Sequence, residues 1–143
     1  MGPIRKLWRL PAADRTLLVT AVLWLAATRF ALWLLPLRVV RRLLARAARS
    51  TPDARPTEER IAWAVSAAGR VVPQATCLPQ ALAAEGLLMR AGYPAELRIG
   101  VIKTDRDRLL AHAWVESGGR IIVGDVRGLR RYAPLPPLPS AHV

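Results

Sequence analysis

The chain has 143 residues, which is enough for one compact domain with a short extra element and too few for two full domains. Hydrophobic residues make up 52% of it and charged residues 22%, a balance that excludes an intrinsically disordered chain. The net charge of +12 favours anionic partners, and the single cysteine excludes an internal disulfide and a multi-cysteine zinc site.

The first strong feature is an apolar segment at residues 16–37. It is about as long as a helix that crosses a bilayer, but Arg29 interrupts it and would cost about 3 kcal/mol in hydrocarbon. Pro36 is expected to end or kink this helix. Because no small-residue cleavage site follows the apolar run, we expect a cytoplasmic protein.

An amphipathic helix is predicted next, at residues 37–49. Its basic face would consist of Arg38, Arg42, Arg46 and Arg49. Its apolar face would consist of Val40, Leu43, Leu44 and Ala47. The pattern leaves open whether residues 1–50 contact a membrane through residues 16–49, dock on a partner protein, or pack on the rest of the domain with a solvated basic face.

After a proline-containing linker at residues 51–56, two helices are predicted. Thr57 suits the start of the first, which ends near Gly69. Its buried stripe would be Ile61, Ala64, Val65 and Ala68. The second would run from Cys77 to Arg90, with Thr76 as N-cap and Gly92 as C-terminal cap.

Three strands are predicted at residues 95–102, 109–117 and 120–126, the last two joined by a tight turn at Gly118 and Gly119. Residues 57–132 would therefore form an α+β domain in which helices pack on a small antiparallel sheet. The proline-rich tail, residues 133–143, is expected to be extended.

The chemistry-bearing residues are a lone cysteine, a histidine and an aspartate. Cys77 lies at a predicted helix start, where unpaired N–H groups and the helix dipole favour a thiolate. In a hairpin with a two-residue loop at Gly118 and Gly119, Ser117 pairs with Arg120. The residue numbers of each pair then sum to 237, so that His112 lies opposite Asp125. Each residue alone has an ordinary structural explanation, but the combination is typical of a Cys-His-Asp triad.

Four other polar residues could take part in or compete with this triad. The Cys77 backbone N–H and the side chain of Gln74 are candidates for stabilising an oxyanion. Asp105 and Asp107 are alternatives to Asp125, although they belong to a charged turn. Glu116 shares the face of His112 and is expected to be a surface charge.

The order of the three residues on helix, strand and strand resembles the transglutaminase-like, papain-like cysteine protease core, here with an N-terminal helical extension. The segments CLPQALAAEGLLMRAGYPAELRIGV, LLAHAWVE and GD resemble the leader peptidases of lasso-peptide biosynthesis, over residues 61–125. This resemblance implies an enzyme that cuts the leader from a ribosomally made precursor peptide through a thioester, with Cys77, His112 and Asp125 as its triad. It also implies two partners, a separate leader-recognition protein and an ATP-dependent lasso macrolactam synthetase.

We expect no cofactor, metal or nucleic-acid partner, because the sequence has no phosphate-binding loop and no cluster of metal ligands. Two alternatives stay open. The protein could be a transglutaminase-like acyltransferase, which would form the same thioester. It could also be a non-enzymatic protein whose positive charge binds membranes or nucleic acid.

Overall fold

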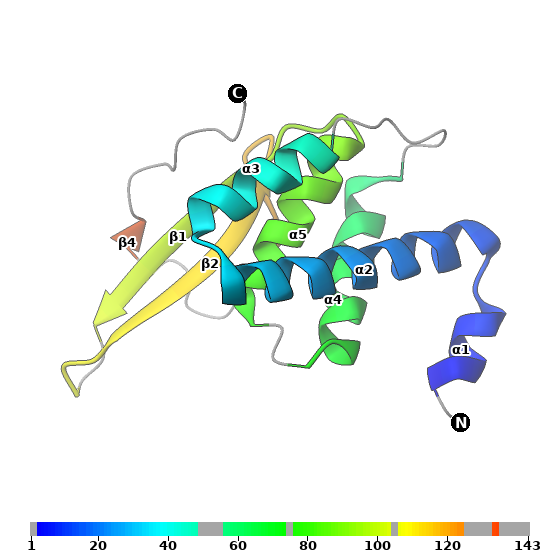
Figure 1. The fold of residues 1–143 in the computed structure, drawn as a ribbon, viewed down its shortest axis with the longest axis horizontal. Helices are drawn as coiled ribbons and strands as arrows, with labels where there is room; N and C mark the ends of the chain where they lie inside the picture. The colour runs from blue at the N-terminus through cyan, green and yellow to red at the C-terminus, as the bar shows by residue number, and fades with distance from the viewer. Residues whose placement is uncertain (1–2, 49–55, 74–75, 104–105, 125–132, 135–143) are drawn as a thin grey trace.

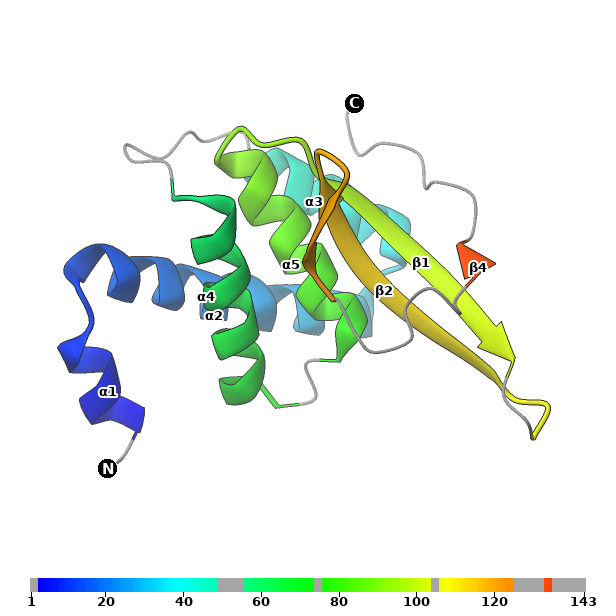
Figure 2. The same ribbon diagram turned by 180° about the vertical axis from the view of Figure 1, so that it is seen from behind.

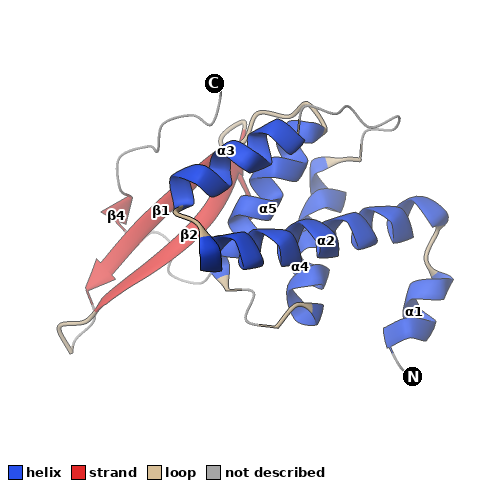
Figure 3. Cartoon of the chain, in the orientation of Figure 1, coloured by secondary structure: helices blue, strands red, loops and turns tan. Residues whose placement is uncertain are grey.

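The computed structural model describes residues 3–48, 56–73, 76–103, 106–124 and 133–134. Within these residues the chain forms five helices and one four-stranded antiparallel sheet in the order β3-β2-β1-β4 (Figure 1). The helices are α1 (Pro3–Arg9), α2 (Ala12–Leu34), α3 (Leu37–Ala47), α4 (Glu58–Val71) and α5 (Cys77–Arg90). The strands are β1 (Glu96–Lys103), β2 (Leu109–Ser117), β3 (Arg120–Val123) and β4 (Ala133–Pro134). The predicted α+β class, helices on a small antiparallel sheet, is confirmed (Figure 3).

Helix α5 is the centre of the molecule, and its predicted limits at Cys77 and Arg90 are confirmed. It contacts α2, α3, α4 and the sheet, so that every residue from Ala81 to Leu88 is buried. Figure 2 shows α4 beside it, with α2 and α3 behind the two helices. Gly86 is required at the crossing with α2, because a Cβ atom there would lie 2.3 Å from the ring of Trp24. Gly92 follows the helix with φ +86° as its C-terminal cap.

Helix α4 confirms the predicted start and buried stripe. The Thr57 hydroxyl accepts a hydrogen bond of 3.2 Å from the backbone N–H of Arg60. The buried residues are Ile61, Ala64, Val65 and Ala68. The helix continues past Gly69 to Val71, and Gly69 instead leaves room for the side chain of Gln80 on α5.

Helices α2 and α3 form one side of the molecule, in front of α4 and α5 in Figure 1. The break predicted at Pro36 is confirmed, because α2 ends at Leu34 and Pro36 is the N-cap of α3. The predicted apolar face of α3 is correct for Val40 and Leu44 and wrong for its other two members, since Leu43 and Ala47 are exposed.

The inward positions that sequence analysis missed are Leu37 and Arg41 on α3 and Ala48, its C-cap. Arg41 faces inward because its guanidinium lies 3.3 Å from each carboxylate oxygen of Glu85 on α5. A charged residue thus lies on the buried side of an amphipathic helix, where the hydrophobic pattern alone predicts an apolar one.

The hairpin between β2 and β3 begins as predicted and then departs from the predicted register. Gly118 and Gly119 have φ +56° and +82°, and Ser117 pairs with Arg120. Glu116 then pairs with Ile121, but Val115 pairs with Val123, so β3 contains one extra residue. This β-bulge makes the prediction of a constant register wrong beyond Glu116, and β3 ends at Val123 rather than Val126.

Candidate active site

Cys77 is the first residue of α5 and is half-buried against the hydrophobic core. Thr76 is the N-cap, as predicted, but its side chain makes no capping hydrogen bond. The first backbone bond of the helix runs from the N–H of Gln80 to the carbonyl of Thr76, at 3.3 Å. Because the N–H groups of Cys77 and Leu78 precede this bond and Pro79 has none, two donors at the thiol have no partner within the helix ladder.

His112 lies in the middle of the sheet, on β2, opposite Gly100 of β1. Its Nε2 is 2.5 Å from the carbonyl oxygen of Gly124, the residue that follows β3. Since a carbonyl only accepts, Nε2 carries the proton of the neutral ring. This contact holds the ring against the segment that leads to Asp125.

Gly124 can take this position because it has no side chain. Its φ is +96°, and a Cβ atom would lie 2.8 Å from both the Ala113 carbonyl oxygen and the Trp114 Cβ. Gly124, directly after β3, therefore lies at close backbone distance from Ala113 and Trp114 of β2, and this approach brings its carbonyl to His112.

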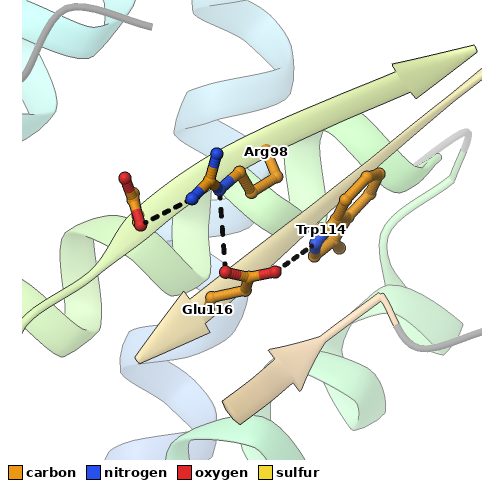
Figure 4. A network of polar contacts seen from close by, with 4 residues as sticks. Arg98, Trp114 and Glu116 are labelled. Atoms are coloured by element: carbon orange, nitrogen blue, oxygen red, sulfur yellow. Dashed lines mark hydrogen bonds and ion pairs between the residues drawn. The ribbon is translucent and has the colours of Figure 1, made fainter. Parts of the chain in front are cut away.

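A polar network that includes Trp114, Glu116 and Arg98 lies beside His112 on the same face of the sheet (Figure 4). The ring of His112 stacks on Trp114, with centroids 6.2 Å apart and planes at 19°. The Trp114 indole N–H donates to Glu116 at 3.1 Å, and the Glu116 carboxylate is 3.6 Å from the Nε of Arg98. Arg98 also contacts Glu96 at 3.3 Å.

Glu116 is therefore a residue whose role the sequence analysis missed. It was expected to be a surface charge, but three quarters of its side chain is covered and it holds a buried tryptophan that stacks on His112. The alternation of residues 112, 114 and 116 on one strand face was the available signal.

The structure brings together the two elements that carry Cys77 and His112, because α5 packs directly against β2. Alternation along β2 turns Ala113 and Val115 into the core beside α5 and puts His112 on the other face. Within the described part of the chain, no hydrogen bond joins the thiol to the imidazole. The structure therefore brings the two elements together without placing the imidazole on the face of β2 that α5 covers.

Asp125 and Gln74 lie outside the described residues, so their predicted roles stay predictions. The β-bulge does change one argument for Asp125, because the direct opposition to His112 assumed a constant register. Of the two alternatives, Asp105 also lies outside the described residues. Asp107 is on the surface, where it pairs with Lys103 at 3.2 Å.

Comparison with known protein families identifies one family that matches this chain. The profile of the transglutaminase-like superfamily matches residues 21–136, from within α2 to the residues just after β4. This superfamily includes cysteine peptidases and acyltransferases. Searches of curated proteins and of solved structures found no match. Since the profile covers most of the sequence, the chain belongs to the transglutaminase-like superfamily.

Proposed function

We propose that this protein is a cysteine peptidase that removes the leader from a ribosomally synthesised lasso-peptide precursor. The observation that carries the proposal is the position of the thiol of Cys77, at the N-terminus of the central helix of a chain that belongs to the transglutaminase-like superfamily. The strand that bears His112 packs on the same helix, with His112 on its far face. Membership of a superfamily that includes cysteine peptidases supports the chemistry. The segments around Cys77 and His112, which resemble leader peptidases, support the substrate.

The reaction would be acyl transfer through a thioester. The Cys77 thiolate attacks the carbonyl carbon of the scissile bond, and the His112 imidazolium donates its proton to the departing amine nitrogen. A water deprotonated by His112 then attacks the thioester, which releases the leader carboxylate and restores the thiol.

The oxyanion of each tetrahedral intermediate needs hydrogen-bond donors. The backbone N–H groups of Cys77 and Leu78 are the nearest candidates, because the helix ladder leaves them without a partner. Each well-placed donor contributes about 3 kcal/mol in known enzymes. We assign Gln74 as a further donor and Asp125 as the residue that orients His112.

The proposed pathway needs two partners besides the precursor. A separate leader-recognition protein would present the leader, and an ATP-dependent macrolactam synthetase would close the ring of the released core peptide. Both would meet this enzyme in the cytoplasm.

The test is cleavage of a precursor peptide from the same gene neighbourhood, with the recognition protein added, followed by mass spectrometry. Wild-type protein should yield separate leader and core, whereas Cys77→Ala and His112→Ala should yield neither. Circular dichroism must show that both variants are folded. Full cleavage by folded Cys77→Ala would refute the proposal.

An acyltransferase is the second candidate, because the superfamily also includes that chemistry. It would use the same thioester and replace water by an amine. Adding a primary amine in excess distinguishes the two, since an acyltransferase would give a leader heavier by the amine minus water, and a peptidase would give the free carboxylate.

A further inference from the structure

The outer face of α2 is a continuous apolar stripe. Its members, which we call the outer stripe, are Val19, Leu23, Ala26, Phe30 and Trp33. They follow one another at steps of four and three residues, so they lie along one side of the helix over about 21 Å. Leu23 is 63% exposed and Trp33 is 77% exposed, although both are large apolar side chains. Exposed apolar surface of this extent marks an interaction site.

The opposite face of α2 belongs to the core of the domain. Ala21, Leu25 and Thr28 are buried there, and α2 packs against both α4 and α5. By length and composition alone, α2 could cross a membrane. If α2 crossed a membrane, its buried face would lose its contacts with α4 and α5. If α2 lay flat on a bilayer, the lipid would cover the outer stripe and the core would stay intact.

Basic residues dominate the segment that carries the outer stripe. Residues 3–48 contain nine arginines and lysines and one acidic residue, Asp14, which pairs with Arg60 on α4. The exposed basic residues of α3 are Arg38, Arg42 and Arg46. Helix α3 lies on the same side of the molecule as α2 (Figure 1). At the other end of the stripe, the Arg15 guanidinium lies over the ring of Trp8, 5.5 Å from its centroid.

We propose that α2 and α3 dock the protein on an anionic lipid bilayer, with α2 parallel to the surface and the outer stripe in the interface. An apolar strip with tryptophan near its ends and arginine in the same segment matches the composition of helices that lie in a membrane interface. The excess of positive charge opposes a second copy of this chain at the same face. Leu34, Leu35 and Leu43 are exposed as well, so the exposed apolar residues of this segment exceed those of the seam of a two-helix coiled coil.

This proposal does not depend on the peptidase chemistry, and it is tested with lipid vesicles. The full-length protein should float with vesicles that contain phosphatidylglycerol and stay in solution with pure phosphatidylcholine vesicles. Replacing Arg38, Arg42 and Arg46 together by glutamine should weaken binding to the anionic vesicles by about 100-fold, because each arginine near such a surface contributes roughly fivefold.

A matched pair of double variants tests the apolar part. Leu23→Ser with Trp33→Ser removes two members of the outer stripe, and should weaken binding by about 100-fold, at roughly tenfold for each large apolar side chain. Trp63→Ser with Leu109→Ser changes the same two kinds of exposed side chain on α4 and β2. This control should bind as the wild type does.

Quenching by brominated lipids measures the depth. Bromine near the headgroup should quench Trp33 more than bromine at the bilayer centre, since an interfacial helix lies about 5–10 Å deep. The Trp33→Phe variant should lose a large part of this quenching, with the remainder from Trp8, and Trp63→Phe should keep it. Absence of flotation, equal loss in the two double variants, strongest quenching at the centre, or a dimer in light scattering that the Leu23→Ser/Trp33→Ser protein lacks would each overturn the proposal.

Discussion

The Nε2 of His112 and the carbonyl oxygen of Gly124 lie 2.5 Å apart, and this contact joins β2 to the chain that immediately precedes Asp125. It orients an imidazole by a backbone group. A backbone acceptor is set by the path of the main chain, and here that path requires a glycine with positive φ.

Replacing Gly124 by alanine should therefore impair both the fold and the reaction. The new Cβ would contact the Ala113 carbonyl at 2.8 Å in a backbone conformation that favours glycine, which should cost about 2–3 kcal/mol. The displaced carbonyl should also lower the rate of peptide cleavage. Urea denaturation and a cleavage assay measure the two effects.

The control is Gly119→Ala, at φ +82° with no atom within 4 Å of its Cβ position. It should cost only about 1 kcal/mol and leave cleavage unchanged. Equal effects of the two substitutions would show that backbone strain alone matters and that the Gly124 carbonyl has no part in positioning His112.

Glu116 should act as a positioning residue. Glu116→Leu removes the acceptor of the buried Trp114 N–H, and should lower kcat about tenfold with little change in KM, because the ring that stacks on His112 is released. Glu116→Gln keeps an acceptor oxygen and should restore most of the rate. Glu96→Gln, at the exposed end of the network, should have little effect. A uniform rise in KM for Glu116→Leu would contradict this role.

Loss of one member of the ion pair between Arg41 and Glu85 should destabilise the fold more than loss of both. The two side chains are only 11% and 6% exposed, so Arg41→Met would leave a buried carboxylate and should destabilise the fold by about 3–5 kcal/mol. The double variant Arg41→Met/Glu85→Leu should recover much of this loss. Arg42→Met, on the exposed face of the same helix, should change the free energy of unfolding by less than about 0.5 kcal/mol. Additive losses in the double-mutant cycle would argue against coupling.

Stability should depend on pH through Glu59. Its pKa is lowered from the usual 4.5 by a hydrogen bond from its own backbone N–H and then by Arg120 of β3, 3.1 Å away. Because the folded pKa is the lower one, the stabilisation is complete above the unfolded pKa and is lost as pH falls through the folded pKa. The wild type should thus have a higher Tm than Glu59→Gln at neutral pH, and this difference should shrink toward zero as the pH falls through the folded pKa.

Arg120→Gln provides the companion measurement. It should reduce this pH-dependent difference without removing it, because the backbone hydrogen bond is the larger cause of the lowered pKa. A difference in Tm that grows as the pH falls would have the wrong sign for this mechanism.

Local features of the molecule could be predicted from the sequence. The limits of α5, the buried stripe of α4, the break at Pro36 and the Gly118-Gly119 turn were all correct. Each depends on the helical or strand period, on a capping residue or on the special φ range of glycine, all of which act over a few neighbouring residues. The assignments of Asp125 and Gln74 stay predictions.

What only the tertiary structure decided involves partners distant in the chain. Arg41 turns inward because Glu85, 44 residues away, supplies its charge partner. The β-bulge between Val115 and Glu116 shifts the register just before Gly124 approaches β2. Glu116 is covered because Trp114 and Arg98 contact it. Periodicity in a sequence shows which side of an element is apolar, but the free energy of a buried charge, an extra strand residue or a buried N–H depends on the group that packs against it.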